Sequence, residues 1–387
     1  MLKFLSKRLA QMAFLFFLFL SLVFFLLQAQ PGDISNLFID PNLPREVQDQ
    51  VRERLGLDGS VWQQWWTYII NFFQGNLGVS FSQYPRPVTE IILERLPRTL
   101  FLFTLATLFS YVLGFTLGKH LAWRRGGFSE YSVTIGGVLL YTVFYPWFAV
   151  IMILTFGSRL GFFPINGFLT PELWRNAPFG GNQVFNQMLL CLAIAGAVAA
   201  VTALVARRQE ERPRARMIRR VGYGLAIASI ILFWLPQTTM RPFALDIAHH
   251  AVLPVATLTL VAFAGVMLLT RGSMLETLRE DYILTARAKG VPERDIRDRH
   301  AARNALLPVV TSFVLGLAFI IGGGVVTETV FSWPGMGQLL LGATLIEDIP
   351  LATGALGFIG ILALFAHLLV DMLYAVLDPR IRIQAGT

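Results

Sequence analysis

The chain contains eight long apolar stretches, and this pattern restricts it to one class of structure. A helix needs about 20 mostly apolar residues to cross a bilayer. The stretches are continuously apolar and do not alternate, which favours helices over barrel strands. Apolar residues are 55% and charged residues only 14% of the 387 positions, so a soluble domain is excluded. The stretches cover residues 9–27, 99–117, 133–156, 188–206, 218–235, 251–269, 306–330 and 351–373.

Lysines and arginines predict how these stretches are oriented. If eight spans are counted, the basic groups before the first span and after the second, fourth, sixth and eighth all fall on one side. Positive residues stay in the cytoplasm, so we expect both termini to be cytoplasmic. The net charge of +8 then follows from topology, and no nucleic-acid partner is expected. The first stretch is longer than the apolar core of a signal peptide, which predicts an uncleaved helix.

One polar stretch, residues 271–308, interrupts this apolar chain. It holds eight basic and six acidic side chains between two predicted spans. Its first half predicts an amphipathic helix that continues from the span before it and ends near Gly290, a natural stop. The residues expected to share the apolar face of that helix are Leu275, Leu278, Tyr282 and Ala286.

The second half of the stretch predicts a short, charged helix. Pro292 can open it at the first position. Acidic residues come early and basic residues late, as the helix dipole favours, and Ile296 is the only apolar residue between Glu293 and His300. A stiff charged helix that projects from a bundle is suited to dock in the groove of a partner. A solvated loop is the alternative, and the ordered start and stop signals argue against it.

This stretch resembles the cytoplasmic signature loop of ABC importer permeases, in which a glycine precedes a leucine-proline pair at a fixed distance, as Gly290 precedes Leu307-Pro308. Further motifs resemble the dipeptide, oligopeptide and nickel permease group, specifically its B-type subunits. These motifs are Lys7-Arg8-Leu9, Pro31-Gly32-Asp33, Leu55-Gly56-Leu57-Asp58, Gly75-Asn76-Leu77-Gly78, Arg95-Leu96-Pro97, Leu253-Pro254, Glu328-Thr329-Val330-Phe331, Trp333-Pro334-Gly335-Met336-Gly337 and Asp378-Pro379-Arg380.

The resemblance implies a permease without chemistry of its own, in a bacterial plasma membrane. It implies a second permease subunit that completes a heterodimer, two ATP-binding subunits and an exterior substrate-binding protein. ATP and Mg would be bound by those partners, since the chain has no G-x-x-x-x-G-K-[ST] phosphate loop. No catalytic, cofactor or metal residue is expected. The residues implied to couple to the ATP-binding subunits are Thr285, Ala286, Arg287, Ala288, Lys289, Gly290, Val291, Glu293, Asp295, Ile296, Arg297, Arg299, His300, Leu307 and Pro308.

The chain departs from the family pattern in one large segment. Residues 172–246 replace a shorter exterior connection and contain two added apolar runs joined by an arginine-rich loop. An even number of added spans leaves the sides unchanged, so we expect a type I core of six helices plus a hairpin. The expected divisions are an N-terminal helix at 1–29, an exterior segment with an amphipathic helix at 30–97, core helices at 98–171, the hairpin at 172–246, and a core with the coupling loop 271–305 at 247–383.

Polar and small residues inside the spans are further candidates, because a charge in lipid is costly and faces a partner or a cavity. Asp371 predicts either gating or a structural ion pair. Gly322, Gly323 and Gly324 predict close helix packing or flexing during gating. Glu328, at the end of the same predicted span, belongs with these gating or packing residues.

Peptides are the cargo that the resemblance implies. Nickel chelates, opines or sugars remain open, since cargo selection in such importers rests largely on the separate binding protein. An ion-coupled secondary transporter would carry carboxylates or broken helices at mid-membrane, whereas acidic residues here lie mostly at span ends. A membrane enzyme would need a convergent reactive cluster, and the five histidines are scattered. An exporter would need its own ATPase domain or a different loop.

Overall fold

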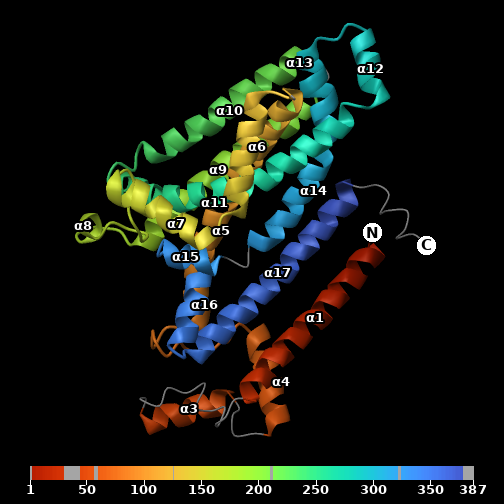
Figure 1. Ribbon diagram of the computed structural model, residues 1–387. Helices are drawn as coiled ribbons and strands as arrows, with labels where there is room; N and C mark the ends of the chain where they lie inside the picture. Colours follow the sequence, from red (N-terminus) through yellow and green to blue (C-terminus); the bar gives the residue numbers. More distant parts are fainter. Residues whose placement is uncertain are drawn as a thin grey trace. The chain divides into compact units, whose positions relative to one another are not determined.

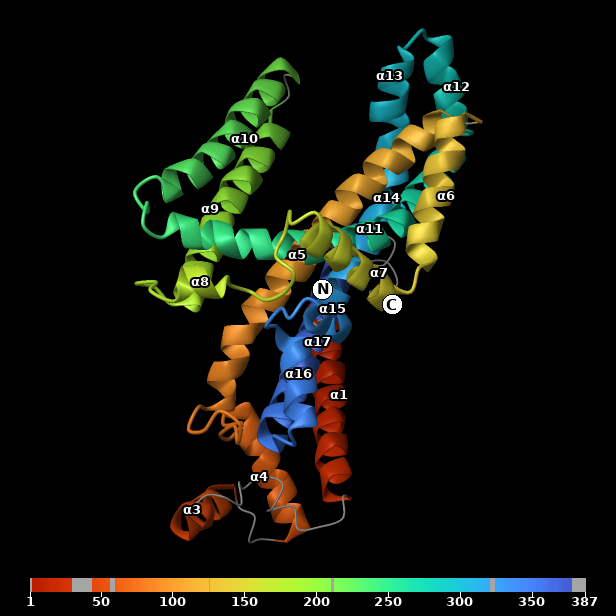
Figure 2. The ribbon, with the colours of Figure 1, turned by 60° about the vertical axis from the view of Figure 1, so that its left-hand side comes forward.

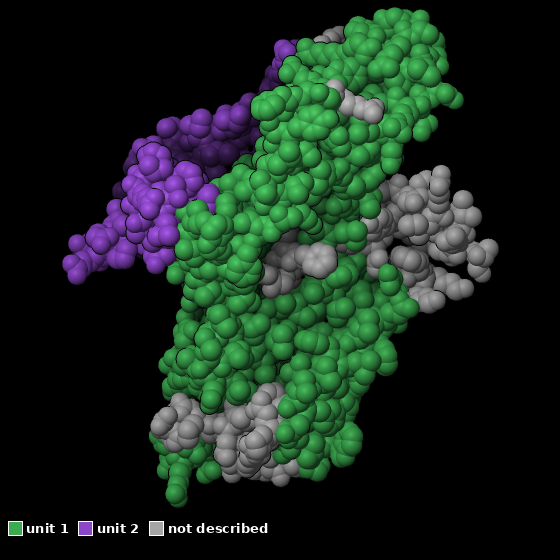
Figure 3. All heavy atoms as spheres, viewed as in Figure 1, with its two compact units in different colours: residues 1–151, 254–387 green, residues 152–253 purple. Residues whose placement is uncertain are grey.

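The computed structural model describes residues 2–29, 44–55, 60–124, 126–209, 212–320 and 324–377. The regular elements within these residues are helices, apart from one isolated bridge between Val79 and Pro87. Figure 1 shows these helices along the chain, and Figure 3 colours the two compact units that they form. Unit 1 comprises Met1–Ile151 and Pro254–Thr387, and unit 2 comprises Met152–Leu253.

Six helices of the described residues contain a stretch long and apolar enough to cross a membrane. They are α1 (Leu2–Gln28), α5 (Val88–Trp123), α9 (Gly181–Arg207), α10 (Arg212–Trp234), α11 (Arg241–Thr277) and α17 (Ile349–Leu377). The predicted span 306–330 falls on α14 (Ala302–Ile320) and α15 (Val325–Val330), and residues 321–323 between them lie outside the described part. The count of eight spans therefore stays a prediction, while a helical, multi-pass membrane protein is confirmed.

The predicted span at 133–156 is interrupted by a sharp bend. The chain forms α6 (Phe128–Thr142), then α7 (Tyr145–Met152) and the π-helical turn η1 (Ile153–Arg159), with a bend of 107° at the break. Pro146 has no N–H to bond the carbonyl of Thr142, and Val143 adopts an extended conformation. The two halves are a broken span or a re-entrant loop, and together they raise the count of candidate spans in the described residues to seven at most.

At one end of unit 1, an aromatic cluster joins α1, α17 and α4 (Val61–Phe73). Phe16 and Phe72 are buried in it with ring centroids 5.5 Å apart. The indole of Trp65 donates a hydrogen bond to Ser21 Oγ at 3.1 Å. The amphipathic helix predicted after the first span is present as α3 (Arg45–Leu55).

Unit 2 contains the two apolar runs of residues 172–246 as the paired helices α9 and α10 (Figure 2). Gly222 of α10 lies so close to Thr202 of α9 that a Cβ would overlap the threonine side chain, a close approach typical of small residues between membrane helices. Asp246 of α11 accepts hydrogen bonds from Thr170 N, Thr170 Oγ1 and Trp174 Nε1, which ties α8 (Pro171–Trp174) to this unit.

The turn before α17 is held by a buried carboxylate. Asp348 accepts hydrogen bonds from Ser80 Oγ at 2.5 Å, Ser82 N at 2.9 Å and Ser82 Oγ at 2.7 Å, and it caps α17 through Leu351 N at 3.2 Å. Burial raises the pKa of Asp348, but these hydrogen bonds to the charged form outweigh it, so the pKa lies below its ordinary value. Asp348 therefore fastens the loop before α5 to the turn between α16 (Met336–Leu345) and α17.

We predict that Asp348→Asn lowers stability by about 2–3 kcal/mol at pH 7, because hydrogen bonds to a charged group contribute about 1.5–3 kcal/mol. Thermal unfolding in detergent measures this as a lower midpoint. Because the pKa of Asp348 is lowered in the folded chain, its charged form stabilises the fold at pH values above the unfolded-state pKa of about 3.9, and this stabilisation is lost as the pH falls. The difference in unfolding midpoint between wild type and Asp348→Asn should therefore narrow below about pH 4. Glu347→Gln removes the adjacent exposed charge and should stay near wild type. Equal midpoints for both variants at pH 7 would refute the assignment.

Candidate functional site

The predicted coupling residues, except Leu307 and Pro308 on α14, lie on a charged segment, residues 278–301, at one end of unit 1 (Figure 2). α11 ends at Thr277, and a turn leads to α12 (Asp281–Ala288). Gly290 follows with φ +74°, a left-handed conformation that favours glycine and stops the helix. The chain then forms α13 (Glu293–Asp295) and the π-helical turn η2 (Ile296–Ala301), which runs directly into α14.

Three details of the predicted segment are wrong. The first helix does not continue from α11, because Glu280 is extended and α12 starts anew with Asp281 in its first turn, where the helix dipole favours an acid. Its buried face carries Ile283 and Ala286, whereas Tyr282 points its hydroxyl to Asn304 Nδ2, which donates at 2.7 Å. Pro292 is the N-cap rather than the first residue of the next helix.

The buried face of the segment packs in an apolar cluster. Ile283 and Ile296 are fully buried in it, so the single apolar residue of the charged helix anchors it to its own subunit. The cluster is built largely from small side chains. Its buried members are Ala122, Met274, Ile283, Ala286, Ile296, Ala301, Ala302 and Ala305.

The opposite face of the segment is exposed. Leu284 is 58% exposed on α12, and the Arg294 side chain is 86% exposed. Most predicted coupling residues lie on this face; Ala286 and Ile296 are buried, and Val291, Asp295 and Arg297 are half-buried. The exposed ones are Thr285, Arg287, Ala288, Lys289, Gly290, Glu293, Arg299, His300, Leu307 and Pro308.

Ion pairs fix the shape of the exposed face. Arg287 Nε bonds Glu293 Oε1 at 3.1 Å across the Gly290 turn, and Arg299 bonds Asp295 at 3.2 Å. These pairs order the side chains without withdrawing them from solvent, since surface pairs add only about 0–1 kcal/mol each. The segment therefore presents a preformed, mixed-charge surface.

One ionic contact joins the segment to α5, and a second joins α6 to α11, the helix that precedes the segment. Asp298 Oδ1 lies 3.1 Å from Lys119 Nζ of α5. Hydrogen bonds from Arg297, and then from Lys119, hold the pKa of Asp298 far below its usual range. Glu130 of α6 is buried and accepts bonds from Arg271 of α11 and from Gly126 N.

Sequence reasoning missed Lys119, Asp298 and Glu130. Lys119 follows an apolar run, and the positive-inside rule accounted for its charge. Asp298 is an acid flanked by two arginines of the charged helix, and this placement was a usable signal of an internal pair.

Glu328 lies in a second polar site of unit 1, where it is fully buried. Its carboxylate accepts hydrogen bonds from Thr99 Oγ1 of α5 at 2.7 Å and from Gln338 N at 2.9 Å. Thr99 Oγ1 in turn accepts from Met336 N at 2.7 Å. These bonds tie α5 to α15 and to α16 (Met336–Leu345).

Trp333 closes this site on one side. It is fully buried, stacks on Phe101 with ring centroids 6.4 Å apart, and donates from Nε1 to the Arg98 carbonyl at 3.1 Å. Gly324, the N-cap of α15, lies against Phe103, since a Cβ there would lie 2.5 Å from the ring. Close packing and flexing during gating both stay predictions for Gly324, and this contact favours the first.

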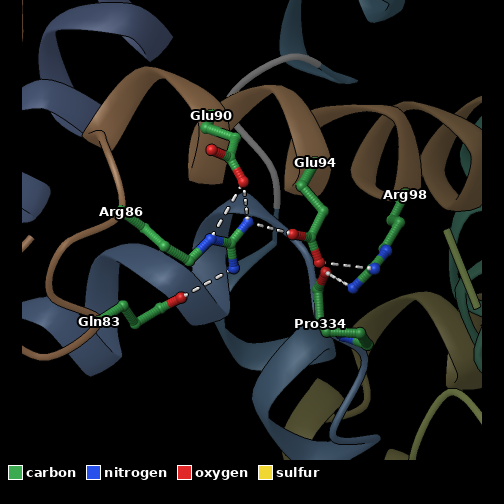
Figure 4. Close-up of polar contacts among 6 residues, drawn as sticks. All are labelled: Gln83, Arg86, Glu90, Glu94, Arg98 and Pro334. Atoms are coloured by element: carbon green, nitrogen blue, oxygen red, sulfur yellow. Dashed lines mark hydrogen bonds and ion pairs between the residues drawn. The ribbon is translucent and has the colours of Figure 1, made fainter. Parts of the chain in front are cut away.

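A row of ion-paired arginine and glutamate side chains runs from this site to the start of α5 (Figure 4). Arg86 bonds Glu90 and Glu94, each at 2.8 Å. Hydrogen bonds to Glu94, and then to Glu90, raise the pKa of Arg86 above its ordinary value. Arg98 bonds Glu94 at 3.0 Å and the Pro334 carbonyl at 3.4 Å.

The remaining predicted residues are placed as follows. Gly322 and Gly323 lie outside the described residues, and Asp371 lies on α17 with its side chain outside the described part. Among described residues, no group of three or more His, Cys, Asp or Glu could hold a metal ion.

The chain matches the family described as the binding-protein-dependent transport system inner membrane component over residues 110–383, more than half its length. The N-terminal family of such membrane components matches residues 1–103. The chain therefore belongs to the binding-protein-dependent transport permeases, inner-membrane components of multi-subunit transporters.

Three relatives match nearly the whole chain. An oligopeptide transport system permease protein of Bacillus subtilis is 29% identical over 360 residues, 93% of either chain. A di/tripeptide transport system permease protein of Pseudomonas aeruginosa is 30% identical over 385 residues, 99% of this chain and 100% of its own. A dipeptide transport system permease protein of Escherichia coli is 29% identical over 383 residues, 99% of either chain.

We predict that Gly335→Ala destabilises the chain, because its Cβ would lie 2.5 Å from Thr99 Oγ1 and overlap the Glu328 carboxylate. Overpacking of this kind costs about 1–3 kcal/mol. Gly342→Ala on α16 is the matched control, since a Cβ there meets nothing within 4 Å, and alanine favours a helix by about 1 kcal/mol. The thermal midpoint in detergent should fall only for Gly335→Ala. Equal midpoints would contradict the tight packing around Glu328.

Proposed function

We propose that the chain is the permease subunit of an ATP-driven importer of short peptides. Its family is shown, and three relatives carry names of oligopeptide, di/tripeptide and dipeptide permeases. The observation that carries the proposal is the charged segment, which has a buried apolar underside and an exposed, internally paired upper face. Such a surface suits a protein partner, not the lipid.

The partner of this surface is an ATP-binding subunit that holds ATP and Mg. The segment docks in a cleft of that subunit, with Leu284 as an apolar contact and Lys289 and Arg294 as exposed charges. Two such subunits, a second permease of a different sequence and an exterior binding protein complete the transporter. Closure of the ATP-binding subunits on ATP rocks the helices between inward- and outward-facing states.

The polar site around Glu328 is a packing joint in this motion. Its carboxylate is bonded to neutral donors on two elements, so it supports the joint without reaching cargo. The bent pair α6 and α7 and the non-helical Gly324 before α15 supply interruptions of helices in unit 1.

Orientation follows from the charges. Both termini and the charged segment are cytoplasmic, and residues 30–97 are exterior. The hairpin α9–α10 crosses the membrane and places its arginine-rich connection in the cytoplasm, where each basic residue near anionic lipid contributes about 1 kcal/mol. Its long, exposed apolar faces are suited to lipid, and we assign it a peripheral position outside the translocation path.

We predict that the double charge reversal Lys289→Glu and Arg294→Glu releases the ATP-binding subunits. Loss of paired charges at an interface costs about 2–5 kcal/mol, and about 1.4 kcal/mol is tenfold in affinity, so recovery of ATP-binding subunits with the purified chain should fall tenfold or more. Arg175→Glu, an exposed arginine of unit 2, is the matched control. Full recovery with the double variant would rule out docking at this face.

We also predict the sidedness of the hairpin. In a Cys191→Ala background, which removes the single cysteine, Gln209→Cys should resist a membrane-impermeant maleimide added outside intact cells. Asn176→Cys, in the connection before α9, should react. Both positions are exposed, so burial does not explain the difference. Labelling of Gln209→Cys from outside would exclude two spans at α9 and α10.

A further inference from the structure

The charged segment touches α5 through a directional contact as well as through apolar packing. Lys119 Nζ lies 3.1 Å from Asp298 Oδ1, and Arg297 donates to both oxygens of the same carboxylate at 2.9 Å. The Arg297 guanidinium lies 5.9 Å from the ring centroid of Trp123, one turn beyond Lys119. Two neighbouring positions of α5 therefore hold two neighbouring positions of η2.

Apolar packing alone would not fix the register of this contact. Five of the eight buried members of the apolar cluster around the buried face of the segment are alanines, whose short side chains interlock little with their neighbours, and hydrophobic attraction has no preferred direction. The Lys119 and Asp298 side chains are only 26% and 30% exposed, so water screens their pair incompletely. The ionic contact is the feature that fixes how the segment is aligned on α5.

α5 reaches from this contact to the site around Glu328. From Thr99 to Lys119 it contains no proline, and 20 residues of helix span about 30 Å. Near the Lys119 end, Gly118 lies so close to α11 that a Cβ would be 2.5 Å from the Met267 carbonyl. At the other end Thr99 bonds the Glu328 carboxylate at 2.7 Å. A rigid helix thus joins two sites that are far apart.

We propose that Lys119 and Asp298 are positioning residues that transmit displacement of the charged segment along α5 to the joint around Glu328. The inference rests on the proposed docking of ATP-binding subunits to that segment. Neither residue belongs to the docking face: Lys119 is on another helix, and Asp298 faces α5. Removing the pair should leave the ATP-binding subunits bound and hydrolysing ATP, while displacement of the charged segment is no longer transmitted to the membrane helices.

The test uses the complete transporter in proteoliposomes, with its binding protein and a tritiated dipeptide as the probe. Lys119→Met and Asp298→Asn should keep the ATP-binding subunits and hydrolyse ATP within twofold of wild type, but dipeptide uptake per ATP should fall at least fivefold. Lys119→Arg restores the ion pair and should restore this ratio. Glu90→Gln removes an exposed ion-pair partner at the far end of α5 and should leave the ratio unchanged.

Three results would overturn the link: loss of the ATP-binding subunits from Lys119→Met, a parallel fall of uptake and hydrolysis, or unchanged uptake per ATP. Failure of the proposed function is distinguishable, because it would appear in the wild-type chain as no recovery of ATP-binding subunits or no dipeptide uptake, and it would overturn the link as well.

A covalent bridge separates transmission from loss of structure. The double variant Lys119→Cys and Asp298→Cys, in the Cys191→Ala background, lacks the ion pair and should be uncoupled. Treatment with a short bismaleimide joins the two positions, and uptake per ATP should then recover toward wild type. A bridged transporter that remains uncoupled would show that a fixed connection at this point is insufficient, and the proposal would fall.

Discussion

Hydrocarbon offers no hydrogen bonds, so each polar group that a membrane helix buries must find its partner inside the protein. Three carboxylates of unit 1 obey this constraint in the same way. Glu130, Glu328 and Asp348 are buried, and each accepts bonds from donors on a segment distant in sequence. Because an acid that loses its donors is left uncompensated, these contacts hold the helix ends of unit 1 together. The fold depends on them more than on apolar packing, which lipid could replace.

Much of this architecture could be predicted from local sequence. Long apolar runs indicate membrane helices, and the turn at Gly290 follows from the conformational freedom of glycine. The contacts between distant residues could not be predicted. Thr99 and Glu328 are 229 positions apart, and no periodicity indicates which hydroxyl meets which acid. Pro146 is a local signal of a bend near residues 143–144, but the apolar run continues through the break, so the sequence does not indicate a bend as large as 107°.

The candidate site shows the same division. The exposed charges of the segment were predicted, since start and stop signals of short helices are local. The attachment of the segment to its own subunit was not predicted. Nothing in the sequence indicates that Ile296 is buried in the same apolar cluster as Met274 rather than against a partner. Ile283 is buried instead of the predicted Tyr282 because α12 begins anew at Asp281. This new start rotates the buried face of α12 relative to that of a helix continuing from α11. A restart of three residues is enough to change which side chains are buried.

A permease that is moved by ATP hydrolysis in partner subunits needs strong contacts that hold its helices together and weaker contacts that transmit the movement. Within α5, Thr99 donates to a fully buried carboxylate, so separating them would remove one of the hydrogen bonds that compensate a buried acid. Near the end of α5 the Lys119–Asp298 pair is partly solvated, and water can compensate its loss. Under the proposed function, the joint at Glu328 therefore persists through the cycle, whereas the link at Lys119 can be weakened by a single substitution without unfolding the helix. Two positions of one helix thus serve different roles: Thr99 contributes to stability, and Lys119 contributes to coupling.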